Sequence, residues 1–226
     1  MKRVITALLA ALLVLSLAAC GSGVETKKLA GTWTCTIDVT DRMNAAAEQA
    51  LGLSAADGAA KMPLQLVLTL TEDGAYTLRY DSDAVRTALD AYAAALHPAA
   101  VESVYAAAEE QGLSREEYDA AMEKAGITMD DMVAAIFAGV DEEELLSLLT
   151  GRSAAITGYC RAEGGQLYLA DTAADLTETA DCLSYTLSDG TMTWTDAQGE
   201  LSSQLTEQEQ ELLRVPLTWT KQAESK

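Results

Sequence analysis

The sequence predicts a mainly β protein, an eight-stranded antiparallel up-and-down barrel with a helical insertion between strands 3 and 4. Three observations lead to this fold class. Apolar and polar residues alternate in eight short segments, which is the period of a half-buried strand. Three pairs of these segments flank short turns rich in Gly and Asp, as antiparallel hairpins do. Between the third and fourth segments the period becomes helical, and Ala, Leu and Glu dominate.

The N-terminus has the pattern of an export signal. Lys2 and Arg3 form a basic start, residues 4–15 are apolar, and small residues precede Cys20. The apolar run is too short and wrongly flanked for a stable membrane span. Residues 1–19 are therefore predicted to be a cleaved signal peptide.

The box Leu17-Ala18-Ala19-Cys20 resembles the lipobox of bacterial lipoproteins. The resemblance implies cleavage between Ala19 and Cys20 and attachment of several acyl chains at Cys20, which would hold the protein firmly on a membrane. We therefore expect a lipid-anchored protein on the extracytoplasmic face of the cell membrane, with residues 20–28 as its lipidated N-terminus and short polar tether. The alternative is an ordinary secretory signal followed by an accidental cysteine.

The chain is strongly acidic. Its formal net charge is −20, and removal of residues 1–19, which carry two basic residues and no acid, makes it −22. Such a surface repels phosphate backbones and anionic lipid headgroups, so we expect no nucleic-acid partner. A solvated, soluble surface is the preferred interpretation, and attraction of cations or basic partners is the alternative.

The first three strands follow the tether. Residues 29–39 show the clearest alternation, and one face of this segment carries Trp33, Cys35, Ile37 and Val39. Residues 41–62 are Ala-rich and predict one or two short helices. Residues 64–71 and 75–80 then form a hairpin around the turn at 72–74, where Asp-Gly supplies the positive φ values that tight hairpins require.

Residues 82–150 form the predicted helical insertion. A first helix runs from residue 83 towards residue 96, and Pro98 starts or kinks a second one. Two hydroxyl residues, each with an acid three positions later, have the spacing of capping boxes: Ser114 with Glu117, and Thr128 with Asp131. A last helix is expected at 142–149. The insertion holds fifteen Asp or Glu against three Lys or Arg, so its outer faces are anionic.

The remaining strands belong to residues 151–226, as the first three belong to residues 29–81. They are expected at 154–162, 166–170, 182–187, 191–195 and 212–220. An acidic loop at 171–181 and a polar stretch at 197–211 connect them. A long antiparallel sheet with one apolar face must be covered or must close on itself, and eight strands can close into a small barrel. The first and last strands would then pair.

The motif Gly31-Thr32-Trp33 in the first strand resembles the Gly-x-Trp signature of lipocalins and other calycins. The resemblance extends over the eight strands and leaves residues 82–150 outside it. It implies a lipocalin-like barrel in which a basic residue packs on Trp33, and Arg214 is the predicted residue. The chain is also similar to lipocalin-like lipoproteins of anaerobic Gram-positive bacteria, a group mostly without assigned function.

No catalytic, cofactor or metal site is predicted, and we do not expect an enzyme. The sequence has no phosphate-binding Gly-Lys loop and no Gly-x-Ser-x-Gly elbow. Its only histidine, His97, has no recognisable partner and is interpreted as a surface or cap residue. The acid clusters at 130–131 and 142–144 lie where helix N-termini favour negative charge. The acidic loop lacks the ligand spacing of a calcium site.

Three cysteines remain besides Cys20, and an odd number cannot all pair within one chain. In an up-and-down barrel, Cys160 falls near the end of strand 4 and Cys182 at the start of strand 6. We therefore place them at opposite barrel ends, beyond the reach of a disulfide. These two residues and Cys35 are predicted to be unpaired.

Six aromatic residues fall on the predicted interior face: Trp33, Tyr76, Tyr80, Tyr185, Trp194 and Trp219. A barrel of eight strands is either filled by its own side chains or holds one small ligand. The bulky residues favour a packed interior and leave a cavity as the alternative. Two functions follow: an envelope interaction module that displays the acidic helices to another protein, or a binding protein for a small apolar ligand with the insertion as its lid. An enzyme is a distant third.

Overall fold

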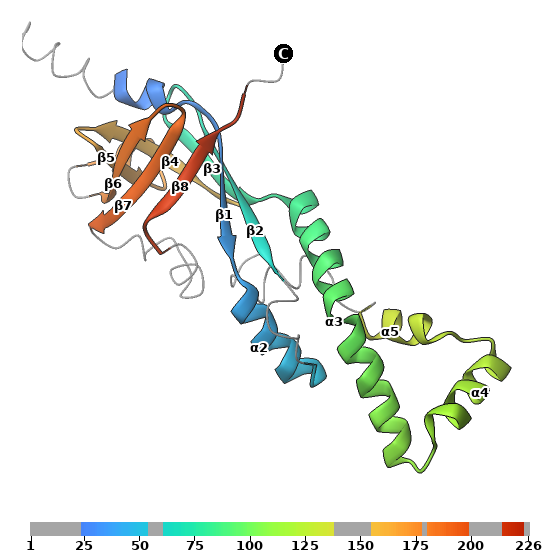
Figure 1. Cartoon of the computed structure of the whole chain (residues 1–226). Helices are drawn as coiled ribbons and strands as arrows, with labels where there is room; N and C mark the ends of the chain where they lie inside the picture. Colours follow the sequence, from blue (N-terminus) through green and yellow to red (C-terminus); the bar gives the residue numbers. More distant parts are fainter. Residues whose placement is uncertain (1–23, 54–60, 138–154, 178–179, 199–213, 224–226) are drawn as a thin grey trace, which may run out of the picture. The chain divides into compact units, whose positions relative to one another are not determined.

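A computed structural model describes residues 24–53, 61–137, 155–177, 180–198 and 214–223. The eight strands form a closed antiparallel barrel in the order β1 to β8, as predicted (Figure 1). They are β1 Gly31–Asp38, β2 Pro63–Leu70, β3 Ala75–Tyr80, β4 Ile156–Glu163, β5 Gln166–Ala170, β6 Asp181–Ser188, β7 Thr191–Gln198 and β8 Leu217–Lys221. The pairing of Trp33 with Lys221 joins β1 to β8. This architecture is consistent with a lipocalin-like barrel.

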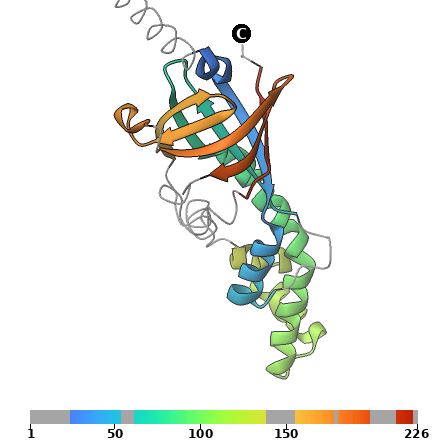
Figure 2. The same ribbon diagram turned by 90° about the vertical axis from the view of Figure 1, so that its left-hand side faces the viewer.

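The period-two pattern decides which side chains fill the barrel, whose curved wall is seen in Figure 2. In the β2–β3 pair, Leu68 lies opposite Leu78, and in the β7–β8 pair, Met192 lies opposite Trp219. All four side chains are buried, whereas Thr218 and Thr220 on the other face of β8 are exposed. The largest fully buried side chains in the strands are Trp33, Leu64, Leu66, Leu167, Leu183, Met192 and Trp219.

The three hairpin turns, at residues 71–74, 164–165 and 189–190, lie at one end of the barrel, which we call the hairpin end. A glycine carbonyl in each turn accepts a hydrogen bond from the strand that follows the hairpin. These bonds are Cys160 N to Gly74 O at 2.6 Å, Tyr185 N to Gly165 O at 2.9 Å and Lys221 N to Gly190 O at 2.8 Å. The turns are therefore tied to their neighbours around the barrel.

Residues 24–29 are helical, where the sequence predicted a polar tether. The helix is fixed at the hairpin end because Thr26 Oγ1 accepts a hydrogen bond from Ala162 N at 3.0 Å. Leu29 is buried, and its carbonyl accepts a hydrogen bond from Trp33 Nε1 at 2.8 Å. The folded part of the chain thus begins at least five residues earlier than predicted.

The chain divides into two compact units, and the division differs from the predicted one. The second unit combines residues 36–65 with residues 81–153, so α2 (Thr40–Leu51) belongs with the helices of the insertion. Those helices are α3 Ser82–Glu110, α4 Arg115–Ala125 and α5 Met129–Phe137. Tyr92 Oη donates a hydrogen bond to Asn44 Oδ1 at 2.7 Å, and Leu53, Ala100 and Val133 share one buried cluster. Apolar residues of two separate connections form this core.

Pro98 neither starts nor ends a helix, which corrects the prediction of two helices. It lies within α3, a single helix of 29 residues. Proline lacks the amide hydrogen that would bond within the helix. Buried residues on both sides of it, among them Leu96 and Ala100, show that the same face of the helix stays packed before and after the proline. No helix in the described part of the chain is long and apolar enough to cross a membrane.

Both capping boxes are confirmed. Ser114 and Glu117 exchange side-chain and backbone hydrogen bonds at the start of α4. Thr128 and Asp131 do the same before α5, with Thr128 N to Asp131 Oδ2 at 2.9 Å. The helix predicted at 142–149 lies outside the described residues, and so does most of the polar stretch at 197–211.

Candidate functional site

The Gly-x-Trp motif lies at the hairpin end, where β1 meets β8. Trp33 is buried, and the Lys221 ammonium nitrogen lies 5.3 Å from the centroid of its ring. Gly31 has φ +130°, and a Cβ at this position would lie 2.7 Å from Lys221 Cε. The glycine therefore allows the lysine stem to pass over the strand and reach the tryptophan, a cation–π arrangement.

Arg214 is not the basic residue on this tryptophan, which corrects the prediction. It is exposed and precedes β8, which begins at Leu217 rather than at residue 212. Only Arg214 was predicted to pack on Trp33, and sequence spacing alone does not distinguish it from Lys221, because both are basic residues near the last strand. The β1–β8 register, with Trp33 opposite Lys221, decides between them.

Replacing Lys221 with Met should lower the free energy of unfolding by about 0.5–1 kcal/mol, because the cation is lost and the apolar stem is kept. Arg214→Met is the control and should leave stability unchanged. Urea denaturation followed by tryptophan fluorescence measures both. Equal effects of the two changes would contradict the assignment of Lys221.

Two tryptophans lie together inside the barrel. The ring centroids of Trp194 and Trp219 are 4.8 Å apart, with their planes inclined at 47°. Trp194 is 4% exposed and Trp219 is 0% exposed. Neither indole nitrogen has a hydrogen-bond acceptor among the described residues. Because buried polar groups are nearly always hydrogen-bonded, two such donors in contact are an exception that needs an explanation.

The surroundings of this pair are mostly apolar, with a negative charge nearby. Met192 and Leu217 are its cross-strand neighbours, and Tyr185 lies opposite Trp194. Burial raises the pKa of Tyr185, and the Glu25 carboxylate and Cys160 raise it further. Glu25 belongs to the helix at 24–29, and its Oε2 is buried without a partner in the described chain.

Cys35, Cys160 and Cys182 are all thiols, as predicted, but the reason differs. Cys160 lies opposite Leu169 on β5, and Cys182 lies opposite Tyr168, so the two cysteines are at nearly the same level of the barrel. The placement at opposite ends was wrong. They instead point to opposite faces of the sheet, because Cys160 is buried inside and Cys182 shares the outer face with Tyr168 and Arg161. Burial raises the pKa of Cys160 to about 12, so this thiol is a poor nucleophile.

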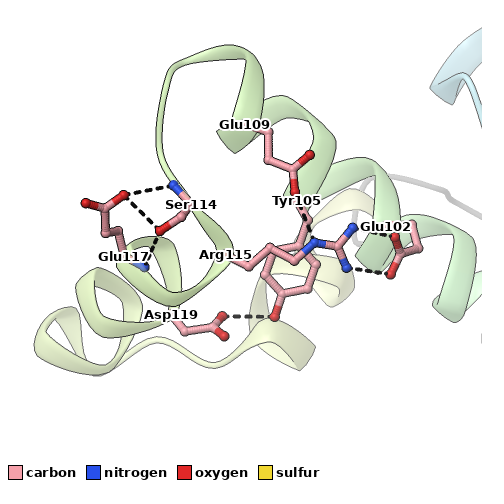
Figure 3. A network of polar contacts seen from close by, with 7 residues as sticks. All are labelled: Glu102, Tyr105, Glu109, Ser114, Arg115, Glu117 and Asp119. Carbon is pink, nitrogen blue, oxygen red and sulfur yellow. Dashed lines mark hydrogen bonds and ion pairs between the residues drawn. The ribbon is translucent and has the colours of Figure 1, made fainter.

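Some acidic side chains of the insertion form hydrogen bonds and ion pairs that join α3 to α4 (Figure 3). Arg115 on α4 makes a bidentate pair with Glu102 on α3, at 2.8 and 3.1 Å, and also contacts Glu109. Tyr105 donates a hydrogen bond to Asp119 at 2.9 Å. These contacts hold α4 against α3 and give the acids a structural role.

His97 has a partner that the sequence did not predict. Its Nε2 lies 3.0 Å from Asp130 Oδ1, so it links α3 to α5. Asp131, the other acid of that cluster, caps α5. Within the described ranges, no three His, Cys, Asp or Glu side chains are grouped closely enough to hold a metal ion.

Ala19 and Cys20 lie outside the described residues, so lipid attachment at Cys20 stays a prediction. The structure brings Gly31 and Trp33 together with Lys221. The sequence placed Trp194 and Trp219 inside the barrel but carried no information on their indole nitrogens, and it assigned Glu25 to the tether. No protein-family model, curated protein or solved structure matches the chain.

Proposed function

We propose that the protein is a lipid-anchored, extracytoplasmic binding protein whose barrel takes up one small, mainly apolar molecule that carries a hydrogen-bond acceptor. The observation behind this proposal is the pair of buried indole N–H groups on Trp194 and Trp219, which lack acceptors among the described residues. Leaving a buried donor unsatisfied costs about 1–3 kcal/mol. A ligand oxygen that lies between the β7 and β8 side chains and accepts these hydrogen bonds would remove that cost. The ligand would then bind more tightly.

The acceptor is expected to be uncharged. The mature chain has a net charge of −22 once residues 1–19 are removed from the −20 of the whole. The Glu25 carboxylate contributes, after burial, to the raised pKa of Tyr185, which lies opposite Trp194, so a carboxylate is present on this side of the pair. An anionic headgroup would be repelled there, whereas an amide, ester or ketone oxygen would not. The neighbouring Met192 and Leu217 favour an apolar body.

The anchor rests on the lipobox resemblance at residues 17–20 and on the basic and apolar residues before it. The alternative, an envelope interaction module built on the acidic helices, has less support. Glu102, Glu109 and Asp119 already contact Arg115 and Tyr105 within the helical unit. Binding inside the barrel explains an observation that the alternative leaves unexplained.

Tryptophan-to-phenylalanine changes test the proposal, because they remove the N–H donor and keep an aromatic ring. Trp194→Phe and Trp219→Phe should each weaken binding of a long-chain amide about tenfold, which corresponds to one hydrogen bond. Trp33→Phe is the matched control, since its N–H already donates to Leu29 O at 2.8 Å. It should lower stability and leave the affinity nearly unchanged.

The measurement is a titration of the full mature protein with uncharged long-chain amides, esters and ketones, with the alkanes of equal length as the reference set. Isothermal calorimetry gives the affinities. Binding of the acceptor-bearing compounds in preference to the alkanes is expected. Failure of every compound to bind, or equal losses in all three tryptophan variants, would contradict the proposal.

A further inference from the structure

We infer that the hairpin end of the barrel is the surface that faces the lipid bilayer. The inference rests on the proposed lipid at Cys20 and does not depend on the ligand that the tryptophan pair is proposed to bind. It commits to one partner, the headgroup layer of the membrane in which the protein is anchored. The argument starts from the helix at residues 24–29.

This helix is held at the hairpin end by buried contacts. Thr26 is 6% exposed, and its hydroxyl accepts a hydrogen bond from Ala162 N near the end of β4. Its methyl group packs near Gly74, 3.6 Å from the position of a Cβ built on that glycine. Leu29, at the end of the helix, is 1% exposed. The helix, drawn in blue before β1 in Figure 1, is therefore part of the folded barrel.

The link between helix and lipid is short. Three residues separate Cys20 from Val24, so the link spans four Cα-to-Cα steps. An extended chain covers at most about 3.6 Å per step, so the link reaches at most about 14 Å. Strands of eight residues such as β1 and β4 are about 26 Å long. A lipid on Cys20 therefore holds the hairpin end near the bilayer, and the link is too short to bring the opposite barrel end to it.

Charge favours the same orientation. Lys27, Lys28 and Lys221 are exposed at this end, and Val24 adds an apolar side chain that is 53% exposed. Among the described residues, the acids at this end are Glu25, Glu72, Asp73, Glu163 and Asp189. A fourth basic residue, Arg161, has its Nη1 3.8 Å from Glu163 Oε2. Acids therefore exceed bases by only one here, whereas the whole chain carries −20. Repulsion from an anionic bilayer is therefore small at this surface.

The test measures how close each barrel end comes to the membrane. The full chain is expressed with residues 1–19 in a bacterial host that lipidates exported proteins, and it is reconstituted into phosphatidylcholine vesicles that contain a headgroup spin-labelled lipid. Single cysteines carry a fluorophore at the hairpin end (Asp189→Cys) or at the connection between β5 and β6 (Ala174→Cys). Both positions are exposed. Cys182→Ser removes the most accessible native thiol from the background.

The fluorophore at 189 should lose most of its emission to the spin-labelled lipid, and the one at 174 should lose little. Inserting a long Gly-Ser segment after Gly23 should abolish this difference, because the link would no longer restrict the orientation. Equal quenching at both positions without the insertion, or stronger quenching at 174, would overturn the inference while leaving the anchor intact. Mass spectrometry that finds no lipid on Cys20 would overturn the anchor and the inference together. Neither result bears on ligand binding inside the barrel.

Discussion

Replacing residues 82–150 with a short Gly-Ser turn should destabilise the chain. We expect a smaller loss of stability when residues 40–61 are replaced with a short turn in the same chain. After the single replacement, α2 keeps its apolar residues but loses the helices that cover them. Leu53 would lose Ala100 and Val133, and Asn44 would lose the hydroxyl of Tyr92. Each large apolar side chain exposed in this way costs about 1.5–3 kcal/mol. When α2 is removed as well, these apolar residues are no longer present, so their exposure no longer destabilises the chain.

Each connection joins two neighbouring strands, β1 and β2 for α2 and β3 and β4 for the insertion. Short turns can therefore replace the connections, and every strand keeps its hydrogen-bonded neighbours. Leu78 on β3 pairs with Ile156 on β4, which confirms the predicted adjacency around the insertion. Val39 N donates to Met62 O at 3.0 Å, so the two ends of the α2 connection are also close. Loop length itself contributes little, since each doubling costs only about 0.6 kcal/mol.

Circular dichroism during heating and binding of a dye specific for exposed apolar surface would compare the two deletion chains. The double replacement should unfold cooperatively, give a spectrum that is nearly all β and bind little dye. The single replacement should melt at a lower temperature and bind more dye. The reverse ranking, or no cooperative transition in the double replacement, would show that the barrel depends on the helical unit.

Gly158→Val should lower the free energy of unfolding by at least about 1–3 kcal/mol, the usual cost of overpacking a core. Gly158 lies opposite Tyr76 in the β3–β4 pair. A Cβ at this position would lie 2.6 Å from the Ala170 carbonyl oxygen and 2.8 Å from Tyr76 Cε1. The carbonyl belongs to the neighbouring strand and cannot move away without breaking the ladder. The tyrosine ring occupies the space that the missing side chain leaves.

Thr157→Val is the matched control. It introduces the same side chain one residue earlier on β4, but on the exposed outer face opposite Thr77. This change should be close to neutral, because no packed neighbour has to shift. Chemical denaturation monitored by tryptophan fluorescence gives both values. A loss of similar size in the two variants would show that β4 tolerates no valine for reasons other than the contact with Tyr76.

Local patterns determined much of the fold. The period of two placed Trp33, Tyr76 and Trp219 inside the barrel, since successive strand residues point to opposite faces whatever the tertiary structure. The turn at residues 72–74 and the box formed by Ser114 and Glu117 were equally predictable. Each depends on residues within a few positions of one another, so a short stretch of sequence contains all the interactions that form it.

Long-range contacts decided what the sequence left open. The lysine on Trp33 comes from 188 positions later in the chain and depends on the β1–β8 register. The helices of two connections share a core because Leu53, Ala100 and Val133 meet in space, and their spacing along the chain carries no sign of it. The contact between the indole rings of Trp194 and Trp219 likewise depends on the pairing of β7 with β8. A sequence pattern determines which face a side chain takes, whereas its partner there depends on segments that only the folded chain brings together.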